Sequence, residues 1–383
     1  MINLNKKELS ARERVRIILN HNEADRVPMD MSSRVTSINV NAYKKLTKYL
    51  MLKEDIEINV DEDVQIVTRI DERVRQKLGT DFVTIFPKSP YNYDPNRKDD
   101  GSYVDQWGVR IKLVGDYSQI YENPLKRASV SDLEQYSWPD PEDEGRFAGL
   151  KEEAKTIYEE MNYVLIGLID GLGSIFERAW KLRGMQNFFI DLISNPKFAG
   201  KLMDKILDFN LRFADRFLDE VGDYVDIIQI GDDFGGKSSL LISPELYAKT
   251  IMPRQKELID FIKSKANVKI FYHTCGSIMP LIDKLLGVGI DILNPIQVSA
   301  DNMDTKELKR RFNKELVFWG AIDSQYILPQ GSTREVEDEV KRRIEDLAED
   351  GGYVLAAVHN IQSDVPPSNI VTMFEAGKRF GRY

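Results

Sequence analysis

The chain of 383 residues is poor in cysteine and histidine, with one and three of them respectively. A disulfide within the chain is therefore impossible, and a single thiol favours a reducing compartment. No apolar run approaches the roughly 18 residues that would predict a membrane-spanning helix. The N-terminus also lacks the apolar stretch of a secretory signal. We therefore expect a cytoplasmic protein with no membrane partner.

Basic residues are also in the minority. Lys and Arg total 53 against 62 Asp and Glu, so the formal net charge is -9. Binding to nucleic acid depends on a basic face that neutralises phosphates, so the acidic balance argues against nucleic acid as the main partner. The 42% apolar and 30% charged residues are typical of a soluble globular protein, and a homo-oligomer is compatible with them.

Short apolar runs alternate with longer helical patterns along the chain. Several of the runs are continuously apolar, as is typical of parallel strands that are buried on both faces. The eight runs are Val27–Met31, Asp81–Phe86, Tyr163–Ile169, Val225–Ile230, Val268–Tyr272, Ile290–Ile296, Leu316–Ala321 and Tyr353–Val358. Eight strand–helix units predict an α/β fold of the (β/α)8 TIM-barrel type. The alternative is an open doubly wound sheet, but its glycine-rich turn after the first strand is missing.

Two segments lie outside this repeating pattern. Residues 1–26 include a helical pattern over Leu9–Asn20 and predict an N-terminal helical extension. Residues 91–124 are polar, and their alternation over 103–113 predicts an antiparallel hairpin inserted after the second strand. This insertion either covers a substrate or decorates the surface. We expect residues 1–383 to form a single barrel domain, with long helices over Asn195–Asp219, Pro244–Ala266 and Arg334–Glu349.

Two of the three histidines follow or end predicted strands. His273 and Cys275 are separated by one residue after the fifth strand, so their side chains can point the same way. His359 follows the eighth strand. The carboxyl ends of barrel strands share one face, so the three side chains can converge there. One thiolate and two imidazoles, with a fourth position open, are typical of catalytic zinc. A buried thiol beside a hydrogen-bonded histidine is the alternative.

Acidic residues follow three other predicted strands. Asp232 and Asp233 follow the fourth strand and are candidate catalytic residues, which could orient a metal-bound histidine, bind the metal or hold a polar substrate. The alternative for this pair is a helix N-cap. Asp323, after the seventh strand, and Asp170, after the third, are candidate substrate-binding residues. The glycines beside Asp170 either let the backbone approach a ligand or only form a turn.

An ordered set of motifs resembles the uroporphyrinogen decarboxylase superfamily over nearly the whole chain. The motifs are Arg12-Glu-Arg14, Ala24-Asp-Arg-Val-Pro28, Asp105-Gln-Trp-Gly108, Phe176-Glu-Arg-Ala-Trp180, Ile242-Ser-Pro-Glu-Leu-Tyr247, His273-Thr-Cys-Gly-Ser277, Asp291-Ile-Leu-Asn-Pro295, Phe318-Trp-Gly-Ala-Ile-Asp323 and the segment 351–367. The superfamily fold is the (β/α)8 barrel, in agreement with the strand count.

The resemblance implies one of two chemistries. The decarboxylases bind a polycarboxylate porphyrinogen through an arginine-rich segment after the first strand. Here that segment is Asp30-Met-Ser-Ser-Arg34, which lacks a close arginine pair and would compensate a polycarboxylate poorly. Asp30 and Arg34 are candidate substrate-binding residues. The other branch comprises corrinoid-dependent methyltransferases, whose zinc ligands are a His-x-Cys pair and a distant cysteine. His273 and Cys275 match that pair. His359 stands in the place of the distant cysteine, where the decarboxylases also have a histidine, and is a candidate ligand or acid–base residue.

The resemblance therefore favours a zinc-dependent methyltransferase that moves a methyl group between a small methylated substrate and the cobalt of a corrinoid. The chain lacks an Asp-x-His-x-x-Gly cobalamin motif, so a partner protein is expected to supply the corrinoid. A histidine in place of a thiolate leaves more positive charge on the zinc, which favours the demethylating half-reaction of an oxygen- or nitrogen-bound methyl group. The alternatives are a uroporphyrinogen decarboxylase and a non-catalytic barrel that binds a corrinoid or tetrapyrrole.

Overall fold

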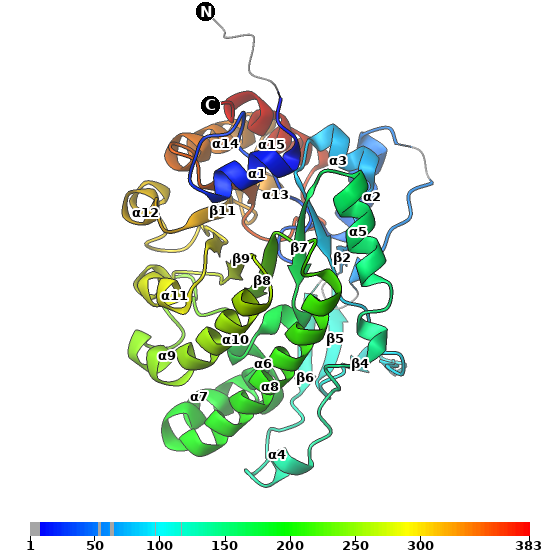
Figure 1. The fold of residues 1–383 in the computed structure, drawn as a ribbon, viewed down its shortest axis with the longest axis vertical. Coiled ribbons are helices and arrows are strands. Elements are labelled where there is room, and N and C mark those ends of the chain that lie inside the picture. The colour runs from blue at the N-terminus through cyan, green and yellow to red at the C-terminus, as the bar shows by residue number, and fades with distance from the viewer. Residues whose placement is uncertain (1–7, 53–54, 62–64, 96, 116) are drawn as a thin grey trace, which may run out of the picture.

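The computed structural model describes residues 8–383, except 53–54, 62–64, 96 and 116. Residues 1–7 of the predicted N-terminal extension lie outside the described residues. Seven parallel strands form one sheet in the order β12-β11-β10-β9-β8-β7-β3 (Figure 1). Their bounds are β3 (Phe82–Ile85), β7 (Val164–Leu168), β8 (Ile227–Gly231), β9 (Lys269–His273), β10 (Ile292–Asn294), β11 (Val317–Ile322) and β12 (Tyr353–Ala357).

The predicted first strand, Val27–Met31, closes this sheet between its two edges. The backbone N–H of Asp30 donates to the carbonyl of Leu355 in β12 at 3.0 Å, and the N–H of Leu355 donates to Pro28 at 2.9 Å. On the other side, the N–H of Asp81, next to β3, donates to Met29 at 2.9 Å. Met29 and Leu355 pair as an isolated parallel bridge, and Pro28 beside them has no N–H to donate. The predicted (β/α)8 barrel is thereby confirmed.

Alternate residues of the strands fill the barrel interior. This interior cluster contains Phe82, Val164, Ile166, Ile227, Phe271, Ile292, Val317, Trp319, Val354 and Ala356. Trp319 lies among them, with its ring centroid 4.5 Å from that of Phe82 and 4.9 Å from that of Phe271. The intervening strand residues pack against the surrounding helices. Burial on both faces explains why the sequence shows continuous apolar runs there.

Helix α1 (Ala11–Leu19) closes the amino-terminal end of the barrel. Its apolar face, with Val15, Ile18 and Leu19, joins the interior cluster. The other helices are α2 (Val40–Tyr49), α3 (Glu72–Leu78), α4 (Asp132–Gln135), α5 (Leu150–Glu160), α6 (Phe176–Arg183), α7 (Met185–Ser194), α8 (Pro196–Val221), α9 (Pro244–Thr250), α10 (Met252–Lys265), α11 (Ile282–Val288), α12 (Thr305–Phe312), α13 (Ile327–Gln330), α14 (Thr333–Leu347) and α15 (Pro367–Phe380). Within the described part of the chain, no helix is long and apolar enough to cross a membrane.

Two predicted elements differ in detail. The expected helix Pro244–Ala266 is divided into α9 and α10 at Ile251, because Pro253 lies in the first turn of a new helix. The inserted segment is antiparallel as predicted, but it has three strands, β4 (Ser102–Val104), β5 (Arg110–Val114) and β6 (Tyr117–Glu122). A separate pair of two-residue strands, β1 (Val60–Asp61) and β2 (Ile66–Val67), precedes α3. Figure 1 shows β4–β6 in the half of the molecule away from the chain termini.

The buried carboxylate of Asp81 provides a test of the barrel closure. It accepts from Arg14 at 2.7 Å, from Arg26 at 2.8 Å and from the N–H of Met29 at 2.8 Å. Asp81→Asn should lower the free energy of unfolding by about 3 kcal/mol or more, because Arg26 loses its carboxylate partner and the buried Arg14 keeps only Asp25. Urea denaturation measures this change. The matched control is Asp260→Asn, in an exposed pair with Lys256, which should cost about 0.5 kcal/mol or less. Equal losses in both variants would contradict the prediction.

Candidate metal centre and the neighbouring cavity

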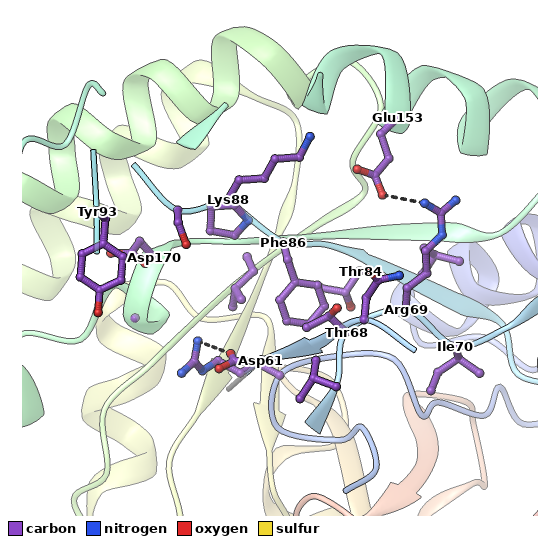
Figure 2. A pocket seen from close by; sticks show the side chains of 18 of the residues that line it. Asp61, Thr68, Arg69, Ile70, Thr84, Phe86, Lys88, Tyr93, Glu153 and Asp170 are labelled. Carbon is purple, nitrogen blue, oxygen red and sulfur yellow. Dashed lines mark hydrogen bonds and ion pairs between the residues drawn. The ribbon is translucent and has the colours of Figure 1, made fainter. Parts of the chain in front are cut away.

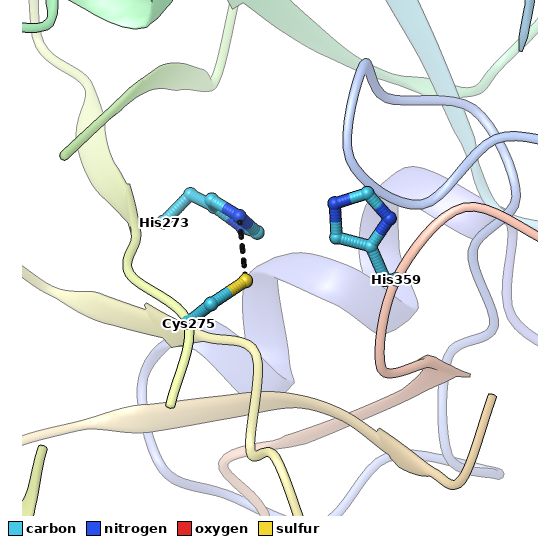
Figure 3. Close-up of side chains that lie close together, drawn as sticks. All are labelled: His273, Cys275 and His359. Carbon is cyan, nitrogen blue, oxygen red and sulfur yellow. Dashed lines mark hydrogen bonds between the residues drawn. The ribbon is translucent and has the colours of Figure 1, made fainter. Parts of the chain in front are cut away.

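Three potential metal ligands meet at the carboxyl end of the barrel. His273 ends β9, Cys275 follows two residues later, and His359 follows β12. One ligand atom from each lies within 4.8 Å of the other two. The Cys275 Sγ is 3.3 Å from the His273 Nε2, and His359 faces this pair across a short gap (Figure 3). The structure thus brings together the three residues that the sequence proposed as ligands.

Asn294 fixes the orientation of His273, which the sequence analysis did not foresee. It ends β10 directly beside His273 in the strand register, and its Oδ1 lies 2.6 Å from the His273 Nδ1. The Asn294 Nδ2 donates to the carbonyl of Trp319, so the Oδ1 faces the histidine. A proton on Nδ1 is then donated to Asn294, and the lone pair of Nε2 points towards Cys275. A ring anchored through one nitrogen is the usual arrangement of a metal-binding histidine.

The cluster fits a zinc ion in both donor type and spacing. Around a tetrahedral zinc, with bonds of about 2.0 Å to nitrogen and 2.3 Å to sulfur, ligand atoms lie about 3.3 to 3.5 Å apart. The Cys275 Sγ and the His273 Nε2 have this spacing, at 3.3 Å, and the ligand atom of His359 lies within 4.8 Å of the other two residues' ligand atoms. Burial, and then the carboxylates of Asp233 and Glu177, raise the pKa of Cys275 well above its usual value. A cation at this position would favour the thiolate and offset the carboxylates.

Asp233 and Asp232 leave β8 in different directions. The Oδ1 of Asp233 accepts from the N–H of Cys275 at 2.7 Å and lies 3.7 Å from the His273 Nε2. Asp233 therefore adjoins the cluster. Asp232 is buried and turns towards α6, where it accepts from the N–H groups of Ile175, Phe176 and Glu177. Asp232 therefore caps the start of α6 from another element, and is not the N-cap residue of a helix that follows its own turn. Its catalytic role stays a prediction.

A buried polar network holds Asp232. Ser174 Oγ donates to its Oδ1, and Gln255 Nε2 donates to its Oδ2 at 3.1 Å. Gln255 also donates to the hydroxyl of Tyr272 at 2.6 Å, directly before His273. Burial, and next the charge of Glu177, raise the pKa of Asp232 to about 6, although the hydrogen bonds act in the opposite direction. Asp232 therefore connects β8, β9 and α6.

Asp30 and Asp323 have local structural contacts. Asp30 is buried, accepts from Ser32 and Thr36, and receives the indole N–H of Trp319 at 3.2 Å. Burial raises the pKa of Asp30. Asp323 accepts from the backbone N–H groups of the next turn, at residues 325 and 326. Their proposed roles in substrate binding remain predictions.

A cavity of about 1160 Å³ opens beside the strands β3 and β7 and the inserted sheet (Figure 2). Arg34 and Asp170, two predicted substrate-binding residues, line it together with Phe86 and Tyr93. Arg34 is paired with Asp61 at 2.8 Å. Charged and aromatic side chains therefore surround a space large enough for a small-molecule ligand. The three potential metal ligands are not among its described lining residues.

Comparison with known families identifies the barrel. The family described as Uroporphyrinogen decarboxylase (URO-D) matches residues 104–380, well over half of the chain. The chain belongs to this family. This confirms the resemblance that the ordered motifs suggested, including those around His273 and in the segment 351–367.

Relatives in the URO-D family carry names of two kinds. The uroporphyrinogen decarboxylase of Prochlorococcus marinus is 23% identical over 71% of this chain and 75% of its own length. The methylcobamide:CoM methyltransferase MtbA of Methanosarcina acetivorans is 26% identical over 62% of this chain and 65% of its own length. A solved methyltransferase from Methanosarcina mazei has a TM-score of 0.63 at 18% identity, covering 97% of this chain and 99% of that one. The structural likeness supports the fold.

His359 should make the stability of the metal-free protein depend on pH. Burial, and then the nearby His273, lower the pKa of His359 from 6.5 to about 4. The unfolded chain therefore binds the proton more readily, so stability should fall as the pH drops from about 6.5 to about 4. In chelator-treated protein, His359→Gln should remove only about 1 kcal/mol of this loss, because the imidazole is partly exposed to solvent. Urea denaturation at several pH values measures it, and parallel profiles for the two proteins would contradict the assignment.

Proposed function

We propose that this member of the URO-D family is a zinc-dependent methyltransferase that demethylates a small substrate and passes the methyl group to the cobalt of a corrinoid on a partner protein. The observation that carries the proposal is the cluster of His273, Cys275 and His359, with their ligand atoms within 4.8 Å of one another. The relative named as a methylcobamide:CoM methyltransferase supports the same reaction class.

The residues around the cluster have separate tasks in this proposal. His273, Cys275 and His359 would hold the zinc, and Asn294 keeps the Nε2 of His273 aimed at it. Asp233 fixes the backbone of Cys275. A bound zinc would act as a Lewis acid towards an ether oxygen or amine nitrogen that has a free lone pair, and would make it a better leaving group. A quaternary ammonium has no such lone pair, but it already leaves as a neutral amine. With two neutral imidazoles and one thiolate as ligands, this effect should be strong, and it favours oxygen- or nitrogen-bound methyl groups.

The decarboxylase alternative is less well supported by the described residues. A porphyrinogen carries many carboxylates, each of which needs a cationic or hydrogen-bonding partner when it leaves water. The segment after the first strand offers Arg34, whose guanidinium is already paired with Asp61 at 2.8 Å. A separate uroporphyrinogen assay therefore belongs in the test of function.

Zinc content is the first expected outcome. Protein purified without chelator should contain about one zinc per chain, and Cys275→Ala should lose most of it. Asn294→Ala should bind zinc about 10 to 100 times more weakly, because His273 loses its orienting partner. His21→Ala is the matched control, since His21 lies beyond the end of α1 and should not affect metal content. Absence of metal from wild-type protein after incubation with zinc would overturn the metal centre.

Methyl transfer is the second expected outcome. Zinc-loaded protein supplied with cob(I)alamin should demethylate quaternary amines or methyl ethers, and Cys275→Ala should lose this activity. The cobalt absorbance spectrum follows the reaction. Parallel reactions contain methylcobalamin with thiols, or uroporphyrinogen alone. Thiol methylation without demethylation would show that the proposed direction is wrong, and carbon dioxide release from uroporphyrinogen would establish the decarboxylase instead.

A further inference from the structure

One end of the cavity contains four charged side chains, Arg146, Asp170, Arg178 and Asp105, here called the charge cluster. Arg146 Nη1 lies 3.8 Å from Asp170 Oδ2, and Arg178 Nη1 lies 3.7 Å from Asp105 Oδ2. Arg146 is buried, whereas Asp170, Arg178 and Asp105 line the cavity. The two pairs make the cluster neutral overall, while both signs of charge face the cavity.

Arg178 is held in place by three surrounding groups. Its guanidinium carbon lies 4.7 Å from the ring centroid of Trp107, and Asp105 adds its carboxylate. Gly171, with a φ of +56°, forms the third side, because a Cβ at this position would overlap the guanidinium of Arg178. Asp105 is fixed in turn, since its Oδ1 accepts from the N–H groups of Trp107 and Val109 at 2.9 and 2.8 Å. Arg178 is therefore preorganised.

Asp170 is held beside Arg178 by the inserted segment. Gln106 Nε2 donates to the Asp170 Oδ2 at 3.1 Å, and the Gln106 Oε1 accepts from Arg146. Asp170 directly precedes Gly171, the glycine against which Arg178 packs. An anionic and a cationic side chain therefore lie at the same end of the cavity, both fixed by residues of the insertion.

We propose that this end of the cavity binds a zwitterionic substrate, with its carboxylate on Arg178 and its ammonium group on Asp170. The inference rests on the proposed function and names its substrate class, an N-methylated amino acid. A neutral zwitterion leaves the charge cluster neutral and gives each of its ends an oppositely charged partner. A simple anion on Arg178 would also lie near the carboxylate of Asp170, and a simple cation on Asp170 would also lie near the guanidinium of Arg178. Tyr93 also lines the cavity and offers an aromatic face to a methylated ammonium (Figure 2).

The first turn of α6 connects this subsite to the metal centre. Glu177 directly precedes Arg178, and its N–H donates to Asp232 at 2.8 Å. The next residue in the chain, Asp233, accepts from the N–H of Cys275 at 2.7 Å. The chain of contacts from Arg178 to the candidate zinc ligands thus runs through the first turn of α6, then through Asp232 and Asp233 after β8, and ends at the backbone of Cys275. A substrate anchored on Arg178 would lie on the same face of the barrel as those ligands.

Calorimetric titration with glycine betaine tests the proposal. Choline and acetate, which each carry one of its two charges, serve as comparison ligands, and all three are titrated into zinc-loaded and chelator-treated protein. Betaine should bind about tenfold or more tightly than either comparison ligand, because both charged ends find a partner. Arg178→Met and Asp170→Asn should each weaken betaine binding by about tenfold or more.

The matched controls come from the same cavity. Arg69 and Glu153 also line it and form an ion pair at 3.4 Å. Arg69→Met and Glu153→Gln carry the same chemical changes and should alter betaine binding by about twofold or less. Gly171→Ala should weaken binding like Arg178→Met while it retains the arginine, because the new Cβ displaces the guanidinium. Thermal unfolding of each variant identifies those that remain folded.

The outcomes separate this proposal from the proposed function. Undetectable betaine binding, wild-type binding by folded Arg178→Met, or equal losses in the Arg69 and Glu153 controls would overturn the zwitterion site. Demethylation of a methyl ether without betaine binding would overturn the zwitterion site and leave the methyltransferase in place. Betaine binding that depends on Arg178 and Asp170, without any methyl transfer to cobalt, would support the site and overturn the methyltransferase.

Discussion

The carboxylate of Asp232 determines how the candidate site is arranged. It is fixed at the end of β8 and accepts three consecutive backbone N–H groups at the start of α6. Those groups have no partners within the helix, so a carboxylate there stabilises the helix end through hydrogen bonds and through the helix dipole. The following residue, Asp233, fixes the loop that carries Cys275. The position of α6 and the position of the thiol therefore depend on the same two-residue turn.

The parallel barrel supplies the rest of the geometry. Every strand delivers its carboxyl end to one face, so residues that are far apart in the chain become neighbours there. His273 and Asn294 are partners in the register of β9 and β10, and His359 enters from β12. The inserted segment with β4–β6 adds Asp105, which lies between β4 and β5 and is not part of the barrel itself. The barrel thus provides the candidate metal ligands, whereas the insertion provides part of the cavity wall.

Much of this arrangement could be predicted from the sequence, and the exceptions have physical reasons. The seven strands of the sheet were recognisable because burial on both faces requires continuous apolar runs, and their order placed His273 and His359 on one face. The third strand of the insertion, β6, escaped prediction because the apolar residues in its sequence, YSQIYE, do not alternate regularly with polar ones. Asn294 and Arg178 escaped as functional candidates because their roles depend on partners in other elements. Asp232 was singled out from the sequence as a candidate catalytic residue, but its partners on α6 are visible only in three dimensions.

The single cysteine of the chain has a practical consequence. Cys275 is the only thiol, and it lies within the candidate metal centre, so a reagent that is specific for thiols can act at one position only. Burial and two nearby carboxylates keep this sulfur protonated in the metal-free protein and therefore poorly nucleophilic. The rate at which a small alkylating reagent labels the protein would then report the state of one position. No cysteine would have to be removed from elsewhere to make that signal interpretable.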